Sequence, residues 1–173
     1  MQLKAYAKSL KHLTINACIL KEENATGWVV TQPSSAQVFK HLNEFINGFE
    51  NLESLELIGM SIVDNLGDLV TAVKRPKLKM LSLPYNGIEQ EYCLYFQHML
   101  NFETLEHLNL SCNWFGMPGL ARFKQHFRHF KRLKVLNLSN NKLCNDEGHD
   151  TREFRDVLLA VKDQLEELYI SEN

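Results

Sequence analysis

The chain has 173 residues, a length that suits one domain, and its 45% hydrophobic and 23% charged residues are typical of a globular protein. A formal net charge of −2 gives no reason to expect a nucleic-acid or membrane partner, and no run approaches the roughly 18 apolar residues of a membrane span. The first eight residues lack the apolar core of a signal peptide. The four cysteines form no CxxC pair, so we expect free thiols in a reducing compartment and a cytoplasmic location.

A nine-residue pattern of the form LxxLxLxxN recurs along the chain. It is clearest at residues 105–113 and 133–141, where asparagine occupies the ninth position. Four further copies begin at Leu10, Leu52, Leu78 and Leu165, so that successive copies start 26 to 32 residues apart after a first interval of 42. A fixed period of this length indicates a repeat architecture.

Each copy predicts a short strand, because its fourth and sixth residues alternate as side chains on one face of a strand do. The predicted strands lie near residues 12–16, 54–58, 80–84, 107–111, 135–139 and 167–171. The long first interval predicts an irregular insertion near residues 21–33. Apolar residues at helical spacing then predict a helix in each spacer, near residues 34–49, 66–73, 92–100, 120–130 and 154–161.

The ninth position is expected to hold the chain together where it turns away from each strand. A buried asparagine amide there can satisfy backbone groups that the turn would leave without partners. Met60 occupies this position in the second copy and cannot donate such a bond, so we expect that repeat to be the softest. Pro84 lacks a backbone N–H, so the third strand should end there or bulge outward.

These copies resemble the ribonuclease-inhibitor-like class of leucine-rich repeats, and the resemblance covers nearly the whole chain. It implies an α/β solenoid, or horseshoe, with a parallel sheet on the concave face and helices on the convex face. Residues 1–173 would form a single repeat domain. Because the last copy stops at its ninth residue, we expect either a fragment of a longer array or an end covered by self-association.

Members of this class commonly bind proteins on the concave face, so the resemblance implies a protein-binding surface there. Aromatic and other large side chains are frequent anchors of such interfaces. The expected partner-binding residues come from the third, fifth and eighth positions of the copies: Glu56, Met80, Tyr85, His107, Asn109 and Asn137. The alternative is that this face is solvated scaffold and that contact occurs elsewhere.

Other candidate sites are weaker. Trp114 follows a ninth-position asparagine, and core filling is the commoner fate of such a residue, with exposure at the loop edge as the alternative. Trp28 lies in the insertion and is either functional or part of a spacer. His126 and His129 share one helix, but further ligands at suitable spacing are missing, so we expect no metal.

The sequence therefore predicts a non-enzymatic protein-interaction module without a cofactor. It contains no phosphate-binding glycine loop and no nucleophile motif of known catalytic families. One alternative is a regulatory or targeting repeat domain of a larger enzyme whose catalytic part lies outside this chain. Another is a bacterial effector acting in a host cytoplasm.

Overall fold

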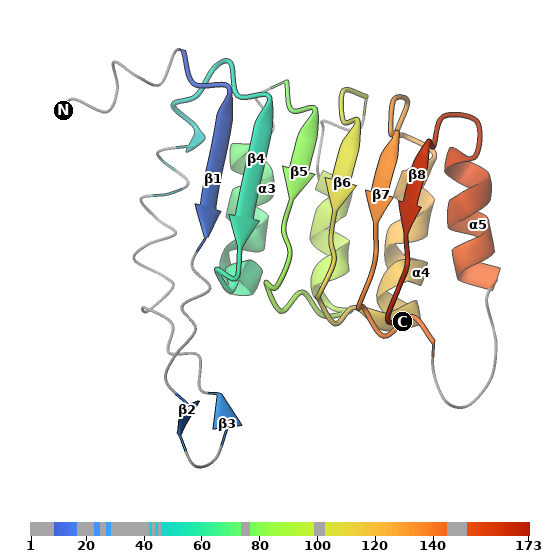
Figure 1. The fold of residues 1–173 in the computed structure, drawn as a ribbon. Helices are drawn as coiled ribbons and strands as arrows, with labels where there is room; N and C mark the ends of the chain where they lie inside the picture. Colours follow the sequence, from blue (N-terminus) through green and yellow to red (C-terminus); the bar gives the residue numbers. More distant parts are fainter. Residues whose placement is uncertain are drawn as a thin grey trace.

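Six parallel strands form one sheet in the order β1-β4-β5-β6-β7-β8. The computed structural model describes residues 9–16, 23–24, 27–28, 42, 44, 46–73, 77–98, 103–144 and 152–173. The strands are β1 (His12–Asn16), β4 (Ser54–Ile58), β5 (Met80–Ser82), β6 (His107–Asn109), β7 (Val135–Asn137) and β8 (Glu167–Tyr169). Figure 1 shows them side by side, with β1 and β8 at opposite ends of the sheet. The predicted parallel α/β repeat fold is confirmed.

The register of the sheet follows the repeat pattern residue for residue. Leu13 lies opposite Leu55, Leu55 opposite Leu81, and Leu81 opposite Leu108, all at the fourth position. Stacking identical positions buries one continuous row of leucines, because neighbouring parallel strands lie about 4.8 Å apart. In the four central strands this row is no more than 1% exposed: Leu55, Leu81, Leu108 and Leu136.

Helices cover one face of the sheet and leave the other open (Figure 1). They are η1 (Ile62–Asn65), α3 (Leu66–Ala72), η2 (Tyr92–His98), α4 (Gly116–Phe127) and α5 (Arg152–Val161), where η marks a 3-10 helix. Phe96, Phe123, Phe127 and Phe130 form a ring cluster behind the sheet, with centroids 4.7 to 6.2 Å apart in the contacting pairs. The helices thus supply the apolar layer that seals the leucine rows.

The last four strands end two residues earlier than predicted, after Ser82, Asn109, Asn137 and Tyr169. In β6 and β7 the asparagine side chain turns the chain early, because its Oδ1 accepts the N–H of the residue two further on, at 3.0 Å in both cases. In β5 the following Pro84 offers no N–H, as anticipated. The eighth residue of these copies then adopts a left-handed backbone: Tyr85, Cys112, Asn140 and Glu172, with φ of 54 to 59°.

The helical segments also depart from the predicted ones. Residues 92–98 form a 3-10 helix, and the predicted continuation over Met99 and Leu100 lies outside the described residues. Helical structure begins at Ile62, four residues before the predicted start, because a 3-10 turn precedes α3. Repeats of 26 and 27 residues leave less chain for a helix than the later repeats, which carry α4 and α5.

Much of the first interval lies outside the described residues. Leu42, Glu44 and Ile46, which are described, are helical within the helix predicted over residues 34–49. Within the predicted insertion, β2 (Glu23–Asn24) pairs antiparallel with β3 (Gly27–Trp28). Among the described ranges, no helix is long and apolar enough to cross a membrane.

Candidate protein-binding face

An asparagine ladder holds the strand ends of neighbouring repeats in place. The fully buried Asn113 accepts the N–H groups of Asn86 (3.1 Å) and Ile88 (3.0 Å) at its Oδ1. Its Nδ2 donates to the carbonyls of Leu83, Leu110 and Ser111 at 2.9 to 3.1 Å. One side chain therefore satisfies backbone groups of two repeats, as the ninth position was expected to do. In the second repeat the N–H of Met60 is bound by Asn86 Oδ1 at 2.9 Å, so the ladder still reaches it.

The ladder is interrupted beside Trp114. The Oδ1 atom of Asn141 is buried and has no hydrogen-bond partner, whereas its Nδ2 donates to three carbonyls. After Asn113 the chain takes a different path: Trp114 forms an isolated bridge with Glu89, and the positive φ falls on Gly116 at the start of α4.

This path leaves Trp114 58% exposed, with the Lys142 ammonium 5.2 Å from its ring centroid. The expectation that Trp114 fills the core is therefore wrong, because the altered turn directs the indole outward. Trp28 lies in β3, and its side chain lies outside the described part of the structure.

The open sheet face carries a chain of polar side chains across four strands. The Glu56 carboxylate accepts a hydrogen bond from Ser82 Oγ at 2.8 Å and a longer one from Thr14 Oγ1 at 3.5 Å. Asn109 Nδ2 donates to Ser82 Oγ at 3.2 Å. These bonds fix the side chains at the fifth position of successive repeats before any partner arrives, which limits the entropy that binding would cost.

Beside this chain lies a hollow of about 170 Å³. Four of the six expected partner-binding residues line it, namely Met80, His107, Asn109 and Asn137. Val135 and Tyr169 complete its wall, and Tyr169 remains 49% exposed while its hydroxyl donates to Glu167 at 2.7 Å. The hollow combines an apolar floor with amide and imidazole groups at its margin, which is the usual chemistry of an anchor pocket.

The two remaining expected residues lie around this hollow in different ways. Glu56 belongs to the polar chain on β4, joined to Asn109 through Ser82. Tyr85 lies in the turn after β5 and is 59% exposed. Sequence reasoning thus placed all six on or beside one face, while it did not distinguish Tyr169 and Val135 as lining residues.

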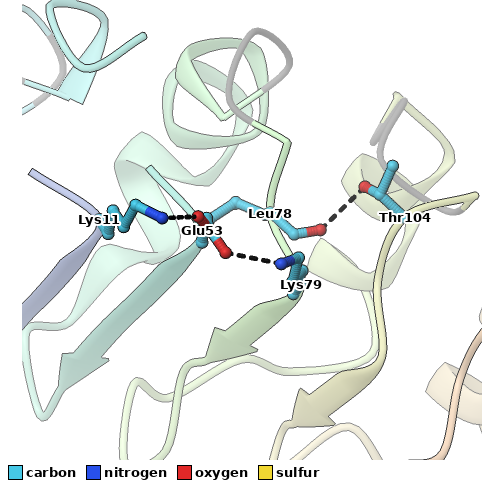
Figure 2. A network of polar contacts seen from close by, with 5 residues as sticks. All are labelled: Lys11, Glu53, Leu78, Lys79 and Thr104. Atoms are coloured by element: carbon cyan, nitrogen blue, oxygen red, sulfur yellow. Dashed lines mark hydrogen bonds and ion pairs between the residues drawn. The ribbon is translucent and has the colours of Figure 1, made fainter. Parts of the chain in front are cut away.

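Charged residues follow the edge of the sheet where the strands begin. Figure 2 shows Glu53 between two lysines, with carboxylate oxygens 2.8 Å from Lys11 Nζ and 2.6 Å from Lys79 Nζ. Hydrogen bonds from Lys11 and then Lys79 lower the pKa of Glu53 from 4.5 to about 2. The same figure shows Thr104 Oγ1 donating to the carbonyl of Leu78 at 2.8 Å, which ties the loop before β6 to the start of β5.

The helical side of the molecule offers no comparable site among the described residues. His126 and His129 have ring centroids 6.5 Å apart, and no group of three or more His, Cys, Asp or Glu residues in the described ranges is placed to hold a metal ion. Burial, followed by the nearby His129, lowers the pKa of His126. Cys93 is buried, which raises the pKa of its thiol to about 12.

Comparison with known proteins agrees with this architecture. The family model described as Leucine Rich Repeat matches residues 132–155. The leucine-rich repeat-containing protein AAC1 of Dictyostelium discoideum is 30% identical over 153 residues, which make up 83% of this chain and 18% of that protein.

Two solved structures share the fold at low sequence identity. The tropomodulin C-terminal domain of Caenorhabditis elegans has a TM-score of 0.57 and 18% identity, over 80% of this chain and 83% of that one. The structure titled Leiomodin-1 Actin-Binding Site 2 has a TM-score of 0.50 and 11% identity, over 98% of this chain and 75% of that one.

Proposed function

Since the chain is a leucine-rich repeat protein with the α/β repeat fold, we propose that it is a non-enzymatic interaction module that binds a protein partner on its open sheet face. The observation that carries the proposal is the hollow between β5 and β8, lined by Met80, His107, Asn109 and Asn137. A partner side chain buried there would meet apolar atoms and amide groups together. Hot spots of protein interfaces have this composition.

The geometry of the face supports this use. Its side chains stand on a sheet whose register is fixed by stacked leucines, and Glu56, Ser82 and Asn109 are already linked by hydrogen bonds. A rigid surface loses little conformational entropy on association, which favours binding at a given contact area. Tyr85 at the edge adds an exposed aromatic ring that a partner extending beyond the hollow would cover.

The titles of the structural relatives suggest the first partner to test. The leiomodin-1 structure is titled as an actin-binding site, so a domain of this fold can take actin as its ligand in that protein. We therefore choose filamentous and monomeric actin as the first probes for this chain. Capture of partners from a lysate would follow if actin is not bound.

The test uses His107→Ala and Tyr85→Ala, because both side chains are exposed and their removal leaves the core intact. Each should weaken the binding of an identified partner by roughly tenfold, measured by titration calorimetry or co-sedimentation. The matched controls are His98→Ala and Tyr95→Ala on the helical side, which should change affinity less than about twofold. If both face variants bind every identified partner as the wild type does, the open sheet face is not the binding surface.

One observation favours an alternative within the same class. The match to AAC1 occupies 18% of that protein, so a repeat unit of this kind can be one part of a much longer chain. The module would then regulate or target a larger protein, and the full open reading frame would reveal the other domains. The bacterial-effector alternative has no such support. Free thiols at Cys93, Cys112 and Cys144 support placing the module in a reducing compartment, the cytoplasm.

A further inference from the structure

The second position of the six repeats alternates in charge along the whole array. From β1 to β8 the residues in this position are Lys11, Glu53, Lys79, Glu106, Lys134 and Glu166. Neighbours pair directly where Glu53 meets Lys11 and Lys79, and again where Lys134 Nζ lies 3.2 Å from Glu166. An alternating row with an even number of members has opposite charges at its two ends. Here the row begins with a lysine and ends with a glutamate.

The backbone at the second position follows an equally regular rule. Its carbonyl accepts the N–H groups of the second and third residues of the next repeat, so that Lys11 O binds the N–H groups of Glu53 and Ser54 at 2.8 and 2.9 Å. The same pair of bonds recurs at every later step, and Lys134 O binds Glu166 and Glu167 at 2.7 and 2.9 Å. The next carbonyl in this series is that of Glu166, at the edge of the sheet.

Both ends of the array expose leucine-row residues that are buried in the middle. At β8 the sixth-position Ile170 is 41% exposed and Leu168 is partly exposed, whereas the equivalent Leu138 is fully buried. Leu159 on the outer side of α5 is 57% exposed. At β1 the equivalent residues Leu13 and Ile15 are also only partly buried.

These three features point to one occupant, and we propose that a second copy of this chain adds its β1 to the free edge of β8 in a parallel, head-to-tail contact. The carbonyl of Glu166 would accept the N–H groups of Lys11 and His12 of the second copy, continuing the backbone rule. The carboxylate of Glu166 would then lie between Lys134 and the lysine of the second copy, as Glu53 lies between two lysines in Figure 2.

The proposed contact goes beyond the proposed function, since it uses the sheet edges and leaves the open sheet face available to a partner. Its two surfaces differ, so the contact is heterologous and can repeat. Repetition produces open filaments or closed rings rather than a symmetric dimer. The ion pair lies at the surface, so the association should weaken as salt is added.

Sedimentation velocity of the 173-residue chain tests the proposal. Between ~5 and ~200 µM, the weight-average mass should rise from the 20.1 kDa of one copy, and about 0.5 M salt should reverse the rise. Glu166→Lys places a lysine against Lys11 of the next copy, and Lys11→Glu places a glutamate against Glu166. Each variant alone should raise the apparent dissociation constant by roughly tenfold or more.

An equimolar mixture of the two variants separates loss of the contact from loss of folding. In the mixture both mutated ends find an opposite charge, so association should return to within about threefold of the wild type. Glu103→Lys, an exposed residue before β6, makes the same charge change away from both edges and should associate normally. A wild-type mass that stays at 20.1 kDa, or single variants that associate as the wild type does, would overturn the proposal. The same holds if the mixture fails to associate while circular dichroism shows both variants folded.

Discussion

Replacing Asn113 with alanine should be one of the most destabilising single changes in the array. Its side chain is fully buried and makes five hydrogen bonds, two accepted from the N–H groups of Asn86 and Ile88 and three donated to carbonyls. Alanine removes all five and leaves no room for water to replace them at full strength. The two backbone donors then lie in the core without partners.

The magnitude follows from these orphaned groups. Leaving a buried donor unsatisfied costs about 1–3 kcal/mol, so two donors cost about 2–6 kcal/mol. The carbonyl of Leu110 retains a bond from Asn141 Nδ2 at 2.9 Å and adds less. We expect a loss of roughly 4 kcal/mol in the free energy of unfolding, a large part of the 5–15 kcal/mol typical of whole domains.

Urea unfolding of wild type and variant measures the loss, and hydrogen exchange at the amides of Asn86 and Ile88 locates it. Asn173→Ala is the matched control, because Asn173 makes equivalent bonds to Asn141 and Leu143 (2.7 and 3.4 Å) at the partly exposed end of the array. Water can replace those bonds, so the control should lose less than half as much. A loss below about 1 kcal/mol for Asn113→Ala, or equal losses in both variants, would refute the reasoning from burial.

Three further outcomes are expected. Because the pKa of Glu53 is lowered from 4.5 to about 2, the folded state binds fewer protons there than the unfolded state; stability should fall as pH drops from 4.5 toward 2, and Glu53→Gln should flatten this part of a urea-midpoint profile. Gly119→Ala should cost about 1–3 kcal/mol despite better helix propensity, because the added Cβ would lie 2.6 Å from Phe115 Cβ and 3.0 Å from Cys93 Sγ; Gly67→Ala, whose nearest contact is 3.3 Å from the Tyr95 ring, is the control in thermal unfolding. The thiol of Cys93, with its pKa raised to about 12 by burial, should resist iodoacetamide at neutral pH while the exposed Cys144 is alkylated, as read by mass spectrometry of the native protein. Comparable unfolding profiles for Glu53→Gln and wild type, a neutral Gly119→Ala, or rapid alkylation of Cys93 would each contradict the corresponding argument.

The start of each strand could be read from the sequence, while its end could not. The leucine spacing is a property of the buried row, so Leu55, Leu81 and Leu108 align in the sheet as the pattern predicts. Where a strand stops depends on which hydrogen bonds the next residues make. Asn109 and Asn137 each bind a backbone N–H two residues on, and an asparagine in a repeat consensus does not reveal that choice.

The candidate site was predictable to the same extent. Counting positions placed Met80, His107 and Asn137 on one face, because strand geometry fixes which side chains share a side. Counting could not show that they enclose a hollow with Tyr169, since that depends on side-chain conformations across four strands. Trp114 was misplaced for a related reason: the turn after Asn113 departs from the path of the other repeats, and the pattern is blind to such a local change.

The alternating second position is the counterexample, since its signal was present in the sequence and needed only the right question. Leucine spacing asks which residues are buried, and the second position is exposed, so it falls outside that pattern. Once the strands are stacked, each second residue has one neighbour on either side, and opposite charges favour the observed register over a shift by one repeat. A shifted stack would place lysine beside lysine, which is unfavourable at this distance. The row therefore contributes to the specificity of stacking within one chain, and the same rule, applied at the sheet edge, selects which end of a second copy fits beside Glu166.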